Sequence, residues 1–224
     1  MQEYLQGVIV AAKGAPTTLL ISLVAVFIGL ILGLLVAMAK MSRFKILRGI
    51  ATIYVDILRG TPLLVQVLIL AYGIPQIISE WFGVSFHWEI KILIGFIACG
   101  VNSSAYMAEI IRSGLQAVDI GQTEAARSLG LSQRQNLRYV IFPQALKNIL
   151  PAIANEFVVI IKESAITYTI GVQDIMSAVN AVRGATFIMV EPLLVATAIY
   201  FCLCFPTSKV IAHFERRMSR GDKR

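Results

Sequence analysis

Charged residues are scarce in this sequence: only 15% of its 224 residues are Asp, Glu, Lys or Arg, whereas 57% are hydrophobic. A typical soluble domain contains about 25% charged residues. This scarcity excludes a water-soluble globule and indicates a chain embedded in a membrane. A chain of this length accommodates five or six membrane helices of about 20 residues each, together with their loops.

Cysteine and histidine are also scarce, with three and two residues respectively. Cys99, Cys202 and Cys204 lie inside apolar runs, and none has the spacing of a metal site with a nearby histidine. We interpret them as small core residues. His87 lies beside a tryptophan and His213 in a basic tail. The sequence therefore predicts no metal site and no set of catalytic residues.

Patterns for nucleotide binding and for internal duplication are both absent. No G-x-x-x-x-G-K-[ST] sequence occurs, so the chain lacks the loop that holds the phosphates of a nucleotide. We therefore expect no cofactor in this chain. We find no duplication of the kind that builds the two halves of many secondary transporters. A transport pathway would then need a second copy of the chain or a paralogue.

Five apolar segments are predicted to cross the membrane, and each is long enough to span a hydrocarbon core of about 30 Å. The first is too long for the apolar part of a signal peptide and is predicted to be retained. In the second, Gly60-Thr61-Pro62 predicts a kink or a restart, because Pro is favoured in the first turn of a helix. The sequence thus predicts an all-α, polytopic integral membrane protein with spans at about 17–39, 50–78, 90–110, 149–170 and 191–211.

The distribution of basic residues predicts the orientation. Four Lys and Arg residues lie at 40–48, five at 112–147 and six at 209–224, which makes 15 of the chain's 20. Because bases concentrate in cytoplasmic loops, these segments are predicted to share the cytoplasmic side, which requires 149–170 to cross. The N-terminus is then outside and the C-terminus cytoplasmic in a multi-pass protein of the inner or plasma membrane. Since the bases adjoin apolar runs, the net charge of +7 indicates membrane lipid, not nucleic acid, as a partner.

The polar segment 112–148 is predicted to form two short cytoplasmic helices between the third and fourth spans. Thr123 is a candidate N-cap of the first helix, which Gly130 would end. Ser132, followed three residues later by a glutamine, has the pattern of a capping box for the second helix. We expect Pro143 to stop that second helix.

Part of this segment resembles the cytoplasmic EAA loop of binding-protein-dependent ABC importer permeases, whose pattern is E-A-A, three residues, G, nine residues and I-x-L-P. The fixed residues are matched by Glu124, Ala125, Ala126, Gly130 and Pro143, while Val140 and Phe142 replace the Ile and Leu. The resemblance implies that the first short helix is the coupling helix, which seats in a cleft of the ATPase subunit. An amphipathic helix lying on lipid headgroups would instead need several bulky apolar residues opposite its bases.

The resemblance extends to permeases for polar amino acids. Residues 59–66 are similar to their RGTPL-x-x-Q segment, and residues 105–114 to their AY-x-AE-x-x-R-x-G segment. Residues 162–166 depart from the K-D-[ST]-[ST]-L of that group. The resemblance implies a type I ABC importer transmembrane domain that translocates a polar amino acid. It also implies partners: ABC ATPase subunits that bind ATP and Mg²⁺, an extracytoplasmic amino-acid-binding protein, and a second permease copy or paralogue.

Three polar residues inside predicted spans are candidates for the substrate pathway: Asn102, Lys162 and Glu163. A charge in the bilayer core costs about 2.5–3.5 kcal/mol on insertion scales, so charged side chains there face protein or water. Glu156 and Glu163 are seven residues apart and lie on nearly one face of a helix. Either Asn102 and Glu163 line a central site, or Lys162 and Glu163 form structural pairs between helices or subunits.

Two other classes of protein fit parts of the sequence. An ion-driven secondary carrier for a small polar solute could use Lys162 and Glu163 as a proton relay. The short, unduplicated chain and the EAA pattern favour the importer over this alternative. A membrane protein without transport activity would not need polar residues at mid-depth in two different spans.

Overall fold

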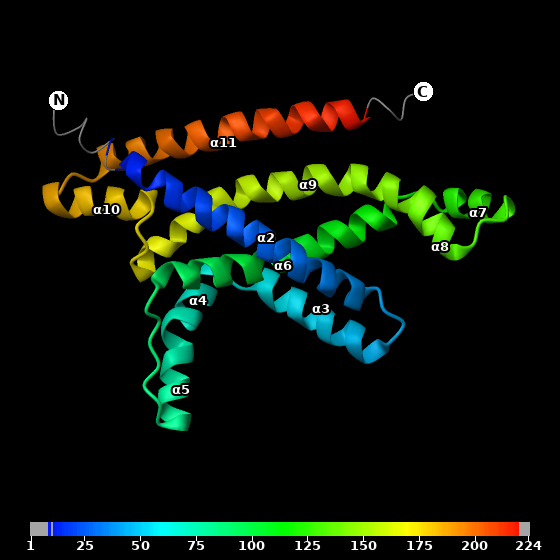
Figure 1. Ribbon diagram of the computed structural model, residues 1–224. Coiled ribbons are helices and arrows are strands. Elements are labelled where there is room, and N and C mark those ends of the chain that lie inside the picture. Colours follow the sequence, from blue (N-terminus) through cyan, green and yellow to red (C-terminus); the bar gives the residue numbers. More distant parts are fainter. Residues whose placement is uncertain (1–8, 10, 220–224) are drawn as a thin grey trace.

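The computed structural model describes residues 9 and 11–219, and the regular structure in this part of the chain is entirely helical (Figure 1). The predicted all-α class is confirmed. The α-helices are α2 (Ala15–Lys40), α3 (Lys45–Gly60), α4 (Leu63–Leu68), α5 (Ile74–Phe82), α6 (Lys91–Gln116), α7 (Ile120–Ser128), α8 (Gln133–Asn136), α9 (Phe142–Glu163), α10 (Ile175–Thr186) and α11 (Val190–Ser219). Between them lie the π-helices η1 (Ile69–Gly73) and η2 (Leu137–Ile141) and the 3₁₀-helix η3 (Ser164–Ile170).

Helix α6 lies at the centre of the bundle, where it contacts α2, α3, α4 and α9. Helix α2 approaches it closely because Gly29 and Gly33 face it. A Cβ atom on Gly33 would lie 2.5 Å from the Cβ atom of Met107, so a larger residue there would force the two helices apart. Small residues commonly allow such close contact between membrane helices. Helices α2, α3, α4 and α9 are therefore positioned against α6, whereas α11 packs on α9.

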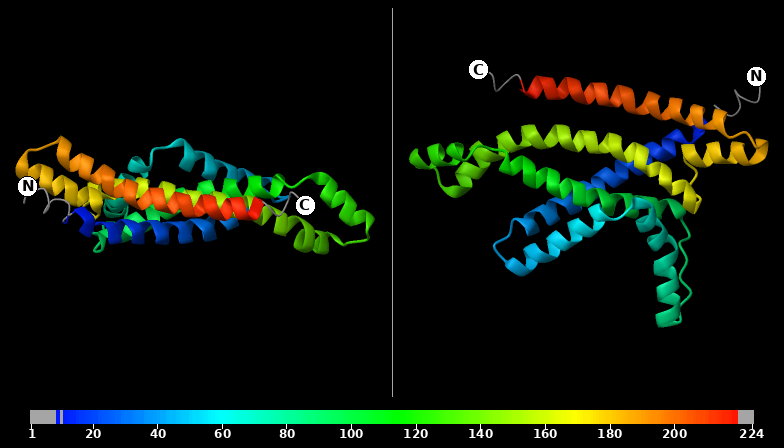
Figure 2. Two further views of the ribbon diagram at one scale, coloured as in Figure 1. Left: turned by 90° about the horizontal axis from the view of Figure 1, so that it is seen from above. Right: turned by 180° about the vertical axis from the view of Figure 1, so that it is seen from behind.

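The long helices α2, α6, α9 and α11 run broadly along one axis, with α7 and α8 at one end and α10 at the other (Figures 1 and 2). Among the residues that the structure describes, four segments are long and apolar enough to cross a membrane: Ala11–Lys40, Leu63–Phe82, Lys91–Gln116 and Val190–Met218. The predicted crossing at 149–170 is not one of these four. It consists of most of α9, which ends at Glu163, followed by η3. A fifth crossing therefore stays a prediction.

The predicted second span, 50–78, is divided into two parts. Helix α3 ends at Gly60, and α4 begins at Leu63 after two extended residues, which confirms the predicted restart. The extended backbone has a local cause, because the residue before a proline disfavours the helical conformation. Helix α3 packs along α2, whereas α5 points away from the bundle axis (Figure 1). Residues 50–78 are thus not one straight helix.

The two short helices between α6 and α9 are present as α7 and α8, but two of their boundaries differ from the prediction. The N-cap of α7 is Asp119, not Thr123, and its carboxylate accepts a hydrogen bond of 2.7 Å from the backbone N–H of Gly121. Ser132 caps α8 with the predicted capping box. Pro143 does not stop the helical path. It lies in the first turn of α9, directly after the wider π-helix η2, which accommodates it.

At the opposite end of the molecule, α10 packs against α11 and the start of α2. Asp174 caps α10 by accepting a hydrogen bond of 2.7 Å from the backbone N–H of Ser177. Its side chain is almost fully buried, and this burial raises the pKa of Asp174 to about 6 against the opposing effect of its backbone hydrogen bonds. The approach of α2 depends on Gly14, since a Cβ atom there would lie 2.3 Å from the carbonyl carbon of Asp174.

The predicted orientation in the membrane depends in part on residues at the two ends of the chain. The first eight residues and the basic residues Arg220, Lys223 and Arg224 lie outside the described residues. The placement of the N-terminus outside and of the C-terminus in the cytoplasm therefore stays a prediction.

Candidate functional site

Helix α7 carries the three consecutive residues of the EAA pattern, at the end of the molecule far from α10 (Figure 1). Glu124 and Ala125 are exposed, whereas Ala126 is only 4% exposed. The three residues thus have two different roles. Glu124 and Ala125 are available for contact with another protein, while Ala126 packs inside this chain.

Gly130 ends α7 in a left-handed conformation, with φ = +83°. The backbone N–H of Gly130 donates to the carbonyl of Arg127 at 2.9 Å, and that of Leu131 donates to the carbonyl of Ala126 at 3.1 Å. This is the Schellman arrangement, in which two carbonyls at the helix end are satisfied. No neighbouring atom lies within 4 Å of a Cβ atom built on Gly130, so the backbone angle, not space, requires glycine.

Large apolar side chains are exposed at both ends of α7. Ile120 is 76% exposed and Leu129 is 81% exposed. Further along, Leu137, Tyr139 and Phe142 are also exposed, as is Pro143. A group of exposed apolar residues on a polar helix pair indicates a surface that contacts another molecule. We call residues 120–143 the coupling loop, after the role that the resemblance to the EAA loop implies.

One side-chain bridge holds this loop against the bundle. The amide nitrogen of Gln144, on α9, donates to the side-chain oxygen of Gln122, on α7, at 3.3 Å, and to the carbonyl of Val140 at 3.0 Å. The loop is therefore tied to the start of α9 as well as to the end of α6.

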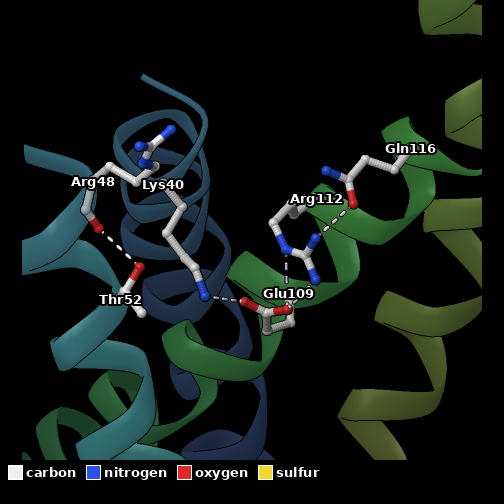
Figure 3. A network of polar contacts seen from close by, with 6 residues as sticks. All are labelled: Lys40, Arg48, Thr52, Glu109, Arg112 and Gln116. Carbon is white, nitrogen blue, oxygen red and sulfur yellow. Dashed lines mark hydrogen bonds and ion pairs between the residues drawn. The ribbon is translucent and has the colours of Figure 1, made fainter. Parts of the chain in front are cut away.

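A network of charged side chains joins the end of α2 to α6 (Figure 3). Lys40 Nζ lies 2.5 Å from Glu109 Oε1. Arg112 binds the other carboxylate oxygen, Glu109 Oε2, through Nη2 at 2.7 Å and through Nε at 3.1 Å. Arg112 Nη1 also donates to Gln116 Oε1 at 2.5 Å. Arg48 and Thr52 of α3 lie close by, where the Thr52 hydroxyl donates to the Arg48 carbonyl at 2.9 Å.

The predicted pathway residue Asn102 is buried in α6, and its side chain is used within the chain. Its amide nitrogen donates to Gln66 Oε1 at 3.0 Å and to the carbonyl of Leu58 at 3.3 Å. Gln66 Nε2 donates to that same carbonyl at 2.9 Å and to the hydroxyl of Thr61 at 2.9 Å. Asn102 and Gln66 therefore satisfy polar groups left open by the break between α3 and α4.

The predicted residues Lys162 and Glu163 lie at the end of α9, and both are exposed on the isolated chain. Among the described residues, neither forms a hydrogen bond or an ion pair, and neither contacts Asn102 in this way. Lys162 lines a cavity of about 390 Å³ between the end of α9 and helices α10 and α11. The structure does not bring the three candidates together within one chain.

Glu156 is the buried acid of α9, with 8% of its surface exposed. The Ser103 hydroxyl on α6 donates to Glu156 Oε1 at 3.3 Å. The sequence indicated that Glu156 faces protein but gave no partner for it. The Lys40 contact to Glu109 was also missed, although the three-residue spacing of Glu109 and Arg112 is visible in the sequence and is typical of a pair on one helix face.

Comparison with known proteins finds extensive similarity. Residues 29–220 match the family described as "Binding-protein-dependent transport system inner membrane component". The chain is 38% identical over 210 residues to "Arginine transport system permease protein ArtQ" of Bacillus subtilis (strain 168), covering 94% of this chain and 93% of that protein. It is 39% identical over 206 residues to "Putative glutamine transport system permease protein GlnP" of Rickettsia conorii, covering 92% and 91% respectively.

Solved structures give the same result. The chain is similar to a protein in the "Crystal structure of an amino acid ABC transporter with histidines", with a TM-score of 0.84 and 44% identity over 93% of this chain and 94% of that one. It shares its fold with a chain of the MetNI methionine ABC transporter in an inward-facing conformation, with a TM-score of 0.70 and 18% identity over 93% and 96% of the two chains.

Proposed function

Since the chain belongs to the family of binding-protein-dependent transport system inner membrane components, we propose that it is the permease subunit of an ATP-driven importer of polar amino acids. The family places it in the inner membrane as a multi-pass protein. The substrate class is supported by the relatives, whose names specify arginine and glutamine, and by the solved amino acid transporter.

This proposal rests on the exposed surface of the coupling loop. Its exposed face, with Glu124, Ala125 and the two apolar residues at the ends of α7, is suited to contact another protein. Gly130 gives α7 a defined end, so that a partner would meet a helix of fixed length. We propose that this face binds the ATPase subunit, which holds ATP and Mg²⁺ and carries out the hydrolysis.

Two further partners belong to the proposed assembly. An extracytoplasmic amino-acid-binding protein would deliver the substrate to the side opposite the coupling loop, with the N-terminus on that side. A second permease copy or a paralogue would complete the pathway.

The proposed mechanism is alternating access. Closure of the ATPase subunits on ATP would bring the coupling loops together and open the central cavity outward, and hydrolysis would reset it. Within this scheme, Lys162 and Glu163 are proposed to face the cavity between two permease copies, since both side chains are exposed on the isolated chain. Asn102 would not face the cavity. It would act by stabilising the break between α3 and α4 through its hydrogen bonds.

The alternative of an ion-driven secondary carrier has less support. The family of this chain belongs to binding-protein-dependent transport systems, and its relatives are permeases. A proton relay would also need Lys162 and Glu163 to be linked to further titratable groups by hydrogen bonds or ion pairs, and they form neither with the described residues.

Reconstitution of the complex into liposomes tests the proposed function. The permease, its ATPase and its binding protein would be assembled together, with radiolabelled amino acids outside. We expect uptake that requires both ATP and the binding protein, and ATP hydrolysis that rises when the loaded binding protein is added. Uptake driven by an ion gradient without ATP would contradict the importer and favour the carrier.

Glu163→Gln tests the proposed pathway by keeping the shape of the side chain and removing its charge. If Glu163 meets the substrate, uptake falls while complex assembly and basal ATP hydrolysis remain. If Glu163 pairs with a base of the second copy, loss of its charge leaves a buried charge unpaired, which is strongly destabilising, and the complex fails to assemble. Uptake and subunit stoichiometry measured on the same membranes decide between these roles, and unchanged values for both would refute them.

A further inference from the structure

We propose that the network of Lys40, Glu109 and Arg112 is a strut that makes α2 move as one body with the coupling-loop end of α6, and so transmits movement of α7 into the helix bundle. The proposal rests on the proposed function, in which α7 contacts the ATPase. The three residues are positioning residues, because they act through α6 and α7 and touch neither nucleotide nor substrate.

The position of the network between the two elements is the first argument. Lys40 is the last residue of α2, and Gln116 is the last residue of α6. The chain of contacts from Lys40 through Glu109 and Arg112 to Gln116 therefore spans from one helix end to the other. Only two residues then separate Gln116 from Asp119, the N-cap of α7. A displacement of α7 is passed to the last turn of α6 with little chain between them to absorb it.

The geometry of the network is the second argument. Arg112 binds one oxygen of the Glu109 carboxylate with two of its nitrogens, and Lys40 binds the other oxygen (Figure 3). Hydrogen bonds between charged groups are short and directional. Arg112 therefore fixes the orientation of the carboxylate, and the fixed carboxylate holds the end of α2.

The partial burial of the network determines how much it contributes to the stability of the fold. The side chains of Lys40, Glu109 and Arg112 are 13%, 18% and 31% exposed. Ion pairs that water reaches contribute little to overall stability. The fold is held together elsewhere, by the apolar core, so the effect of the network is on the relative position of the two helices and not on whether they fold.

Helix α6 is closely packed against its neighbours on both sides of Glu109. Before it in the sequence, α6 meets α2 at Gly33, where an added Cβ atom would lie 3.1 Å from the backbone nitrogen of Ala108. After it, α6 meets α9 at Gly114, where an added Cβ atom would lie 2.3 Å from Cγ1 of Ile149. The network extends the tight contact between α2 and α6 by a further turn or more, towards the turn of α6 that packs against α9 at Gly114.

Lys40→Met tests the strut in the assembled, reconstituted complex. It removes the link to α2 and leaves the Glu109 to Arg112 pair intact. Basal ATP hydrolysis, which the partner subunit carries out, should be retained. We expect the stimulation of hydrolysis by the loaded binding protein, and the amount of substrate imported per ATP, to fall by about fivefold or more, the range of an ordinary coupling between sites.

Two variants serve as controls. Lys40→Arg keeps a cation within reach of Glu109 and should restore coupling to near the wild-type level. Arg43→Met removes an equal charge from the loop that follows α2, where the exposed Arg43 side chain forms no hydrogen bond or ion pair with the described residues, and should leave coupling unchanged. This second control separates the strut from a general effect of positive charge near the membrane.

The outcomes separate the strut from the proposed function. A wild-type complex without stimulated hydrolysis would refute the proposed function itself. A coupled wild type together with a fully coupled Lys40→Met complex would overturn the strut alone. A Lys40→Met chain that fails to assemble, or that assembles in lower amount with normal coupling per complex, would also overturn it, because the network would then act only on stability.

Discussion

The coupling loop and the helix core around α6 hold their residues in place by different means. In the coupling loop, the conformation is set by neighbours in sequence: Asp119 caps α7, Gly130 ends it and Ser132 caps α8. In the core, position depends on contacts between residues distant in sequence, such as Gly33 with Met107 and Ser103 with Glu156. A defect in the loop should therefore affect coupling without unfolding the protein, whereas a defect in the core should affect both.

The largest effect is expected from Gly130→Val. A β-branched residue is strained at φ = +83°, so α7 would lose its defined end and no longer match its partner. We expect uptake to fall more than tenfold while the amount of inserted permease is unchanged, as measured by transport assays and by immunoblotting of membranes. Gly130→Asn is the matched control, because asparagine tolerates the left-handed conformation, and it should retain most of the uptake. Full uptake by the Val variant would show that the end of α7 is not needed for coupling.

The core gives the contrasting result in Gly33→Leu. The new side chain would collide with Met107 and with the backbone of α6, and overpacking of this kind costs about 1–3 kcal/mol. We expect a lower apparent Tm and a lower yield of purified permease, with uptake reduced by more than the loss of recovered protein. Gly49→Leu is the control, since nothing lies within 4 Å of a Cβ atom built there, and it should have a normal Tm. Equal stability of the two variants would mean that α2 and α6 do not pack as described.

What could be predicted from the sequence follows the same division. The Gly130 helix end, the capping box at Ser132 and the restart after Pro62 were predicted correctly, because each depends on the local chemistry of a few residues. The N-cap of α7 was assigned wrongly to Thr123, because both threonine and aspartate are good caps and the apolar pattern around them is weak. Pro143 was assigned as a helix stop, but the π-helix before it lets the helical path continue.

The polar contacts of the core could not be predicted for a different reason. The partners of Asn102 lie 36 and 44 residues away in sequence, and the partner of Glu156 lies 53 residues away. Sequence periodicity gives the face of a helix on which such a residue lies, but not the helix that covers that face. The role of Asn102 in closing the break between α3 and α4 therefore became visible only in three dimensions.

The smallest effect is expected at the far end of the molecule, where Asp174 caps α10. Its folded pKa of about 6 lies above its ordinary value near 3.9, so the folded state binds the proton more tightly than the unfolded state. Stability should therefore rise as the pH falls from 7.5 to 5.5, by about 1 kcal/mol. Asp174→Asn retains a good cap and removes the charge, so its apparent Tm should not show this part of the pH dependence. An identical pH dependence in both proteins would contradict the assigned cause.

Site-directed cross-linking tests the central claim, that α7 is the contact with the ATPase, most directly. In a background with the three native cysteines replaced, Ala125→Cys places a thiol on the exposed face of α7, and Ala126→Cys places one on its buried face. With a reagent that attaches to the thiol and photo-cross-links to any neighbouring residue, we expect the 125 variant to cross-link to the ATPase subunit in a transport-active complex and the 126 variant to react little. A transport-active complex in which the 125 variant forms no such cross-link would contradict the account.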